Sequence, residues 1–407
     1  MRKKRILIIM PYEDIYPPKN GGMLRCFNLF LQYIKYYDVT AVFFQDKNSF
    51  IGSIQAYPSV SNASVYSTRD TKTNFALFSI LPKKIANALK YRWILRTLKT
   101  TTESSFLELY PTLRMLLKEN IYEAIVLENL SLVSQTLFLK KMNPSAQIVY
   151  NSYNVDSELA KQAFENNSGS IENYQNTYFT ERHLYDKIDV LLCCSENDKD
   201  FFTKMNEGRI KKTIIIPNGV DIVKASYHYQ QTEDTLKNIL FCGSLDYEPN
   251  KEGLLWFYEK IWPLILNQKP DLILNVVGRG NASPYETLIK DPTVKFVGEV
   301  ESLRHYYNGC YLSISPLKSG SGTRLKILEA MSFGTPMVST TLGAEGILCV
   351  VGKDILIADG EADFANTIIN LIMDPALARS ISKNARTLVE KTYSWDAIGL
   401  ELKSILN

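Results

Sequence analysis

The feature that most constrains this chain is the alternation, from end to end, of short apolar runs with longer segments of helical periodicity. This alternation is typical of parallel sheets, because parallel neighbouring strands need a long crossover connection that is usually a helix. Apolar runs in the first half predict strands at residues 5–10, 39–44, 124–127, 147–150, 190–194 and 213–216. Runs in the second half predict strands at residues 239–242, 272–277, 294–297, 311–315 and 336–340. Each half therefore has enough strands for a doubly wound α/β sheet of its own.

The length of the chain favours two domains. Its 407 residues exceed the size of most single cores, which stop growing at about 250–300 residues. The turn-forming string Pro217-Asn-Gly-Val-Asp221 precedes a polar stretch without an apolar run, and this change predicts a domain boundary. We expect one Rossmann-like domain over residues 1–217 and a second over 218–390. Residues 391–407 are expected to form a C-terminal helix, capped by Ser394, that packs back on the first domain.

The composition excludes several classes of protein. A content of 45% hydrophobic and 22% charged residues is that of an ordinary globular chain. The net charge of +3 is too small to suggest a nucleic-acid partner. The cysteines form no CxxC pair and the histidines add no zinc spacing, so we expect buried, reduced thiols. No run approaches the ~20 apolar residues of a membrane span, and the run after the basic start is too short for export, so we expect a cytoplasmic protein.

Residues 315–339 carry the most functional information. They predict a strand, a glycine-rich loop, a short helix, a turn and another strand. Gly320 and Gly322 allow the backbone to approach a ligand closely, and Thr323 is expected where the helix begins. The free amides of a helix amino end suit phosphate oxygens, especially beside the carboxyl end of a strand in a doubly wound sheet.

Charged residues follow this loop. Arg324 and Lys326 are expected in the first helical turn, where cations are unfavourable for the helix itself, so they indicate an anionic ligand. Glu329 lies farther along the helix, where its carboxylate could accept hydrogen bonds from ribose hydroxyls. The structural alternative is a solvated first turn above an ordinary buried apolar stripe.

This segment resembles the donor-binding region of retaining glycosyltransferases of the GT-B fold, specifically the large family-4 type that uses nucleotide sugars. Other stretches resemble that family in the expected order, namely 17–25, 217–221, 241–246 with Asn250 and Trp256, 276–280, 296–300 and 343–346. The resemblance covers nearly the whole chain; it is strong over 239–346 and looser between about 45 and 145. It implies two Rossmann-like domains that face each other across a cleft, with the nucleotide sugar held by the second domain.

The resemblance also implies roles for single residues. Glu329 matches the second glutamate of the Glu-x7-Glu motif and would hold the ribose. Arg324 and Lys326 would neutralise the diphosphate and stabilise it as a leaving group. The other donor contacts that the resemblance implies are Gly21, Gly22, Arg25, Gly243, Ser244, Arg279, Glu299, Val300, Gly320, Ser321, Gly322 and Thr323.

Two departures from the family pattern concern the sugar. Ser321 stands where the first motif glutamate is expected. Tyr153 stands at the position of a histidine in the loop that approaches the donor sugar, and a tyrosine with a pKa near 10 positions a sugar but does not shuttle protons. Tyr153, Asn154 and Asp156 are placed on the acceptor or sugar side. The leaving diphosphate can itself take the acceptor's proton, so we expect activity to persist.

The expected function is transfer of a hexosyl unit, with retention, from a nucleoside-diphosphate sugar to a glycan or lipid-linked acceptor in bacterial surface polysaccharide or glycoconjugate synthesis. No cofactor or metal is expected, because Arg324 and Lys326 supply the cations and no DxD pair lies near the donor loops. The alternatives are a weakly active or inactive GT-B partner subunit and a GT-B nucleotide-sugar epimerase. A nicotinamide oxidoreductase is disfavoured, because no GxGxxG fingerprint follows a strand.

A basic segment in the first half stands apart from these motifs. Residues 83–99 hold six positive residues and no acid, and Ile85, Leu89 and Trp93 share one helical face. This pattern predicts that the helix contacts the inner face of an anionic membrane, which would suit a lipid-linked acceptor. The alternative is a helix that packs this apolar stripe into its own domain.

Overall fold

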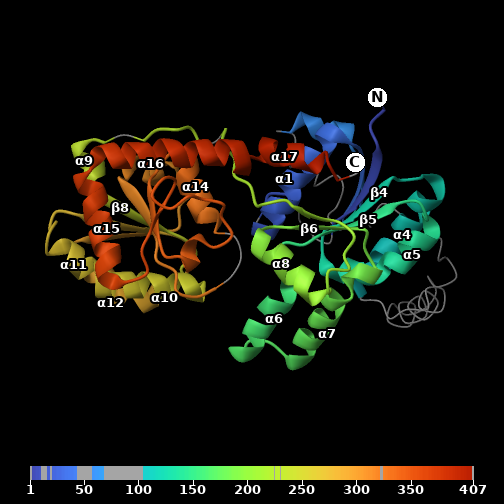
Figure 1. Cartoon of the computed structure of the whole chain (residues 1–407), viewed down its shortest axis with the longest axis horizontal. Coiled ribbons are helices and arrows are strands. Elements are labelled where there is room, and N and C mark those ends of the chain that lie inside the picture. The colour runs from blue at the N-terminus through green and yellow to red at the C-terminus, as the bar shows by residue number, and fades with distance from the viewer. Residues whose placement is uncertain are drawn as a thin grey trace, which may run out of the picture. The chain divides into compact units, whose positions relative to one another are not determined.

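The computed structural model describes residues 2–10, 16–18, 21–43, 57–67, 104–223, 225–229, 231–320 and 324–405. The chain divides into two compact units: unit 1 is Met1–Pro217 with Gly399–Asn407, and unit 2 is Asn218–Ile398. Each unit holds a parallel sheet with flanking helices (Figure 1). The predicted α/β class with two parallel sheets is therefore confirmed. Within the described ranges, no helix is both long and apolar enough for a membrane span.

Unit 1 is built on a seven-stranded sheet of order β3-β2-β1-β4-β5-β6-β7. Its strands are β1 Arg5–Ile9, β2 Asp38–Phe43, β3 Ser64–Ser67, β4 Ala124–Leu127, β5 Gln147–Asn151, β6 Val190–Cys193 and β7 Thr213–Ile215. Ile6 of β1 lies between Val39 of β2 and Ala124 of β4, so the central strands are buried on both faces. The strand order changes direction between β1 and β4, which makes their carboxyl ends the switch point of this sheet.

The helices of unit 1 connect these strands. They are α1 Gly21–Tyr36, α4 Ser104–Glu119, α5 Thr136–Met142, α6 Asp156–Glu165, α7 Ile171–Arg182 and α8 Glu196–Met205. Helices α6 and α7 lie side by side and extend away from the sheet (Figure 1).

Unit 2 is built on a six-stranded sheet of order β10-β9-β8-β11-β12-β13. Its strands are β8 Asn238–Cys242, β9 Ile273–Val277, β10 Val294–Gly298, β11 Leu312–Ser315, β12 Met337–Ser339 and β13 Leu356–Ile357. Its helices are α9 Glu233–Leu236, α10 Glu248–Trp256, α11 Trp262–Leu266, α12 Glu286–Lys290, α13 Arg304–Gly309, α14 Leu325–Phe333, α15 Glu361–Met373 and α16 Pro375–Leu388. The switch point of this sheet lies between β8 and β11, because the chain builds outward from each of them in opposite directions.

All of the strands predicted from apolar runs are present, and two further strands were not predicted. β3 and β13 both lie at the edges of their sheets. Only two residues of β3, Val65 and Ser67, are buried, and β13 has two residues that are both partly exposed. An edge strand that packs so little apolar surface leaves almost no periodic signal in the sequence.

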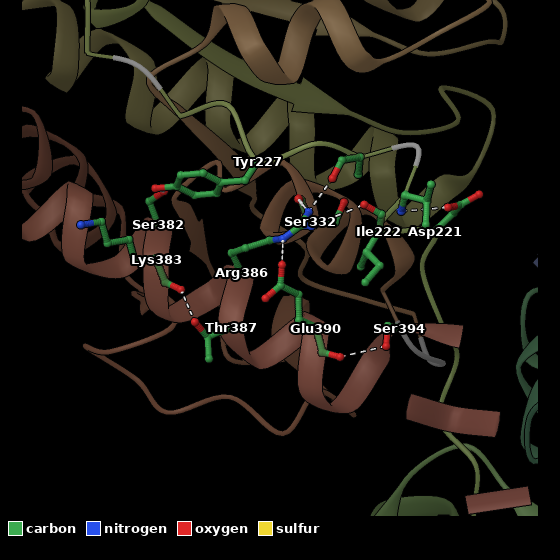
Figure 2. A network of polar contacts seen from close by, with 12 residues as sticks. Asp221, Ile222, Tyr227, Ser332, Ser382, Lys383, Arg386, Thr387, Glu390 and Ser394 are labelled. Atoms are coloured by element: carbon green, nitrogen blue, oxygen red, sulfur yellow. Dashed lines mark hydrogen bonds and ion pairs between the residues drawn. The ribbon is translucent and has the colours of Figure 1, made fainter. Parts of the chain in front are cut away.

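Arg386 of α16 hydrogen-bonds to the first residues of unit 2, at Ile222 and Ala225 (Figure 2). Its guanidinium donates to the carbonyl oxygens of Ala225 and Ser332, and also to that of Ile222 at 3.4 Å. Its Nε lies 2.6 Å from Oε1 of Glu390, one turn along the same helix. Because Ser332 belongs to the last turn of α14, Arg386 joins that turn to the start of the unit.

The last helix, α17 Trp395–Leu402, begins in unit 2 and ends in unit 1. Ser394 caps it as predicted, since its Oγ accepts a hydrogen bond of 3.2 Å from the amide of Ala397. The hydroxyl of Tyr37 donates to the carbonyl of Leu402 at 2.7 Å, within unit 1. The predicted segment 391–407 is thus divided between the units, and Tyr393 stays in unit 2, where its carbonyl accepts from the amide of Val220 at 2.8 Å.

Candidate functional site

The loops at the carboxyl edge of the six-stranded sheet pack backbone against backbone. The amide of Gly243, after β8, donates to the carbonyl of Val277 at 3.0 Å, and the amide of Gly278, after β9, donates to that of Gly298 at 2.8 Å. A Cβ atom at Gly278 would lie 1.8 Å from the carbonyl oxygen of Gly243, so only glycine fits there. Peptide groups therefore form this part of the edge, next to the switch point where doubly wound folds bind ligands.

Lys326 reaches this edge from the first turn of α14. Its Nζ donates to Oδ1 of Asn250 at 2.6 Å and lies 5.0 Å from the ring centre of Phe241. The pKa of Lys326 is lowered to about 8, chiefly by burial; Cys242 opposes this shift, and the charge of Arg324 adds to it. A partly desolvated ammonium of this kind would be stabilised by an anion bound beside it.

Arg324 is the second cation at this end of α14. Its side chain is only 6% exposed. The helix begins at Leu325, not at Thr323 as predicted, so Arg324 occupies the N-cap position, with a φ of −83° and a ψ of 83° that are not helical. Two cations thus lie at a helix amino end, which already carries partial positive charge. Together they make this edge of the sheet strongly favourable for an anion.

Glu329 lies one turn beyond Lys326 on α14 and is partly buried. Burial raises the pKa of its carboxyl to about 7, and a hydrogen bond with the buried Tyr307 hydroxyl lowers it. The ring of Tyr307 is stacked on Phe333 with centroids 5.1 Å apart, which fixes the hydroxyl in place. A carboxylate held in this way can accept hydrogen bonds from ligand hydroxyls.

Most of the other predicted donor contacts lie at the ends of the same strands. Ser244 follows β8 and is partly buried; Arg279 follows β9 and is exposed, although its carbonyl accepts from the amide of Leu245 at 2.8 Å. Glu299 and Val300 follow β10, the first exposed and the second partly buried.

Gly320 ends the described part of the loop after β11. Its φ angle is +93°, and a Cβ atom there would lie 2.8 Å from Cγ of Pro249, so this position requires glycine. The loop after β11 therefore lies against the first turn of α10. The predicted contacts Ser321, Gly322 and Thr323 lie outside the described residues.

The remaining predicted donor contacts belong to unit 1. Gly21 and Gly22 are the first residues of α1. Arg25 is 1% exposed, and its guanidinium donates to the carbonyl of Pro217 and to Oδ1 of Asn151, each at 3.0 Å. These contacts lie within unit 1, so the expected reach of Arg25 to the donor's phosphates stays a prediction.

Glu128 is a site residue that the sequence interpretation missed. It follows β4 and is 1% exposed, and its Oε2 accepts hydrogen bonds of 2.7 Å from the Tyr153 hydroxyl and from Nδ2 of Asn151. Burial raises the pKa of this carboxyl, and the hydrogen bonds and the charge of Arg25 lower it. The signal that could have found it is an acidic residue directly after a fully apolar predicted strand.

Asn154 lies in the loop that follows β5, and Asp156 lies where that loop ends. The carbonyl of Asn154 accepts from the Ser152 hydroxyl at 2.5 Å. Asp156 is the first residue of α6, where its amide donates to Oε1 of Glu181 at 2.8 Å, and burial raises the pKa of its carboxyl to about 6. Glu181 also accepts from the amide of Ser157, so it caps the helix. The sugar-side roles predicted for Tyr153, Asn154 and Asp156 stay predictions.

Residues 236–374, which contain the whole of this edge, match the family described as "Glycosyl transferases group 1". This match identifies a glycosyl transferases group 1 domain over these residues. The predicted relationship is therefore confirmed for the part of the chain that carries Arg324, Lys326 and Glu329.

Known proteins extend the comparison to the rest of the chain. An "Uncharacterized 44.6 kDa protein in cps region" of Klebsiella pneumoniae is 26% identical over 286 residues, which are 68% of this chain and 69% of that protein. Sucrose-phosphate synthase from Thermosynechococcus elongatus has a similar structure, with a TM-score of 0.67 and 17% identity over 98% of this chain and 97% of that one. HepE from Anabaena in complex with UDP and glucose gives a TM-score of 0.62 and 15% identity over 100% and 99% of the two chains. The fold of this chain is thus that of GT-B glycosyltransferase structures.

The basic segment, the search for metal ligands and the cysteines concern other parts of the chain. The basic segment 83–99, expected to contact a membrane, lies outside the described residues. Among the residues that the structure describes, no group of three or more His, Cys, Asp or Glu side chains could hold a metal ion. All six cysteines are free, and five of them are buried.

Proposed function

We propose that this protein is a retaining glycosyltransferase that transfers a hexosyl unit from a nucleoside-diphosphate sugar to a glycan or lipid-linked acceptor. The observation that carries the proposal is the arrangement of Arg324, Lys326 and Glu329 at one end of α14, beside the switch point of a sheet in a group 1 glycosyltransferase domain. Two cations and a carboxylate so placed match a diphosphate joined to a ribose.

The chemistry asked of these residues is stabilisation of the leaving group. When the bond between the sugar and the diphosphate breaks, negative charge grows on the phosphate oxygens, and fixed cations lower the energy of that transition state. Arg324 and Lys326 would supply this charge without a metal ion or other cofactor. Glu329 would hold the ribose and thereby fix the diphosphate against both cations.

A mechanism that retains the anomeric configuration is compatible with the side chains of the loop after β5 in unit 1, because it needs no protein base there. Tyr153 stands where the family pattern has a histidine that approaches the donor sugar, and its hydroxyl donates to Glu128. In the proposed mechanism the leaving diphosphate takes the proton of the acceptor hydroxyl on the face from which it departs. Tyr153, Asn154 and Asp156 would then orient the sugar or the acceptor.

Two relatives suggest substrates. The Klebsiella protein is named for a cps region, and the HepE structure holds UDP and glucose. We accordingly propose a uridine nucleotide sugar as the first donor to test and surface polysaccharide synthesis as the setting. Contact of residues 83–99 with an anionic membrane belongs to the same proposal, because it would bring the enzyme to a lipid-linked acceptor.

A ligand screen followed by product analysis tests the proposal. UDP, GDP, ADP and dTDP, and their common hexose conjugates, are screened for a rise in melting temperature, and the best donor is then incubated with mixed lipid-linked and glycan acceptors. We expect one diphosphate to stabilise the protein by several degrees and the product to keep the donor's anomeric configuration by NMR. An inverted product would refute retention, and no stabilisation by any of them would refute the donor site.

A further inference from the structure

We infer that Asn250 is a positioning residue, which aims the Lys326 ammonium at the donor diphosphate without neutralising its charge. This inference rests on the proposed function. It concerns a side chain on α10, whereas the cations lie at the amino end of α14.

The side-chain amide of Asn250 is engaged at both ends. It is 5% exposed; its Oδ1 accepts from Nζ of Lys326 at 2.6 Å, and its Nδ2 donates to the carbonyl of Ser244 at 2.8 Å. The reverse orientation would put the NH₂ group against an ammonium and the oxygen against a carbonyl, so these partners fix which way the amide points. Asn250 therefore joins Lys326 to the loop that follows β8.

Gly243 leaves the space in which this contact forms. A Cβ atom at Gly243 would lie 2.7 Å from Nδ2 of Asn250 and 3.1 Å from Nζ of Lys326. The amide and the ammonium thus lie directly against the backbone of that loop. Any side chain at residue 243 would displace them, which couples the backbone of the loop to the position of the cation.

The neutrality of the amide is the central point. The groups that act electrostatically on Lys326 are Arg324, which is also a cation, and Cys242, whose thiol stays protonated because burial raises its pKa to about 12. Asn250 adds a strong acceptor without a charge, so the ammonium is oriented and yet keeps its full charge for an anion. An aspartate at residue 250 would hold the lysine equally well but would form an ion pair with it and repel a diphosphate.

The Asn250→Asp variant tests this inference by calorimetry with UDP and with uridine, or with GDP and guanosine if GDP is the diphosphate that stabilises the wild type. We expect affinity for the diphosphate at pH 7 to fall about tenfold or more, while affinity for the nucleoside changes less than about twofold. The new carboxylate should also raise the pKa of Lys326, so the loss of diphosphate affinity at alkaline pH should begin at a higher pH than in the wild type.

Asn275→Asp is the matched control. Asn275 is also a buried asparagine of unit 2, at 7% exposure, and its Nδ2 donates to Oδ1 of Asn238 at 2.9 Å. This control should lose stability but keep its affinity for the diphosphate. If Asn250→Asp does not fold, Asn250→Ala replaces it, with the same selective loss of diphosphate affinity expected from a mobile ammonium.

The outcomes separate this inference from the proposed function. If the wild type binds no nucleoside diphosphate, the proposed function fails and this inference fails with it. If the wild type binds and Asn250→Asp binds equally well, only this inference is overturned. Equal weakening of diphosphate and nucleoside would also overturn it, because that pattern indicates a purely structural role for Asn250.

Discussion

At the scale of single residues, the site on α14 contains two groups whose charged forms are disfavoured by their surroundings. Burial raises the pKa of Glu329 to about 7 and lowers that of Lys326 to about 8. A fold selected for stability alone would place neither charge there. Their presence together at a sheet edge is therefore best explained by a ligand that interacts with both.

Glu329→Gln should stabilise the folded protein at alkaline pH. The pKa of Glu329 rises from 4.5 to about 7 on folding, so stability is undiminished below pH 4.5 and falls as the pH rises through about 7. Glutamine removes that loss while keeping an oxygen that can accept from Tyr307. We expect a gain of about 1–2 kcal/mol in the free energy of unfolding at pH 8, measured by urea denaturation, after allowance for partial exposure of the carboxyl.

The gain should be much smaller at pH 5, where the wild-type carboxyl is mostly protonated, and the variant should bind nucleoside diphosphates more weakly at pH 8. A variant that is less stable than the wild type at pH 8 would contradict the assigned burial of Glu329.

Single residues show where prediction from sequence succeeds and where it stops. The placement of Arg324, Lys326 and Glu329 at one end of α14 could be predicted, because they follow a glycine-rich loop at fixed spacing. The role of Asn250 in holding Lys326 could not, since it depends on which turn of α10 faces α14 across the edge of the sheet. The position of Glu128 directly after an apolar strand could have been noticed, but its partners could not be predicted, since Asn151 ends the neighbouring strand β5 and Tyr153 follows it.

At the scale of elements, α14 depends on contacts at its carboxyl end to hold its amino end in place. Two cations at its start oppose the helix dipole. At the other end, Gly334 adopts a left-handed conformation that ends the helix, and Arg386 donates to the carbonyl of Ser332 (Figure 2). A cation at a helix carboxyl end is favourable and offsets part of the unfavourable charge at the start.

Arg386→Ala should therefore destabilise unit 2 strongly. The substitution leaves the carbonyls of Ile222, Ala225 and Ser332 without this donor, and Glu390 without its ion-pair partner. We expect a loss of about 2–4 kcal/mol in the free energy of unfolding, measured by urea denaturation. Lys383→Ala, an exposed position on the same helix, is the control and should change the free energy by less than about 0.5 kcal/mol. Similar effects of the two substitutions would show that the contacts of Arg386 contribute little to stability.

The elements themselves were predicted to different degrees. Strands buried on both faces were predicted because their apolar runs are continuous. The edge strands β3 and β13 were not, and the start of α14 was placed two residues early, at Thr323 instead of Leu325. The helix was therefore predicted to extend farther toward the glycine-rich loop than it does. The sequence alone does not distinguish an Arg324 inside the helix from an Arg324 at its N-cap.

At the scale of the whole molecule, the chain is two α/β units, each with a switch point that carries buried charge. In unit 2 these charges are Arg324, Lys326 and Glu329; in unit 1 they are Arg25 and Glu128. The charges of unit 2 suit the diphosphate and ribose of a donor. In unit 1 the charge of Arg25 lowers the pKa of Glu128, and a pair of opposite charges suits the proposed binding of a sugar or acceptor hydroxyl.

The central claim is that the edge of the unit 2 sheet binds a nucleoside diphosphate through Lys326, and calorimetry of Lys326→Met tests it most directly. Methionine keeps the apolar length of the side chain and removes the charge. The matched control is Lys290→Met, an exposed lysine with a side chain 79% accessible, on the helix that leads into the opposite end of β10. The account predicts that affinity for the diphosphate falls by about tenfold or more in Lys326→Met and is unchanged in Lys290→Met. Equal affinity of the wild type and Lys326→Met for the diphosphate would contradict the account.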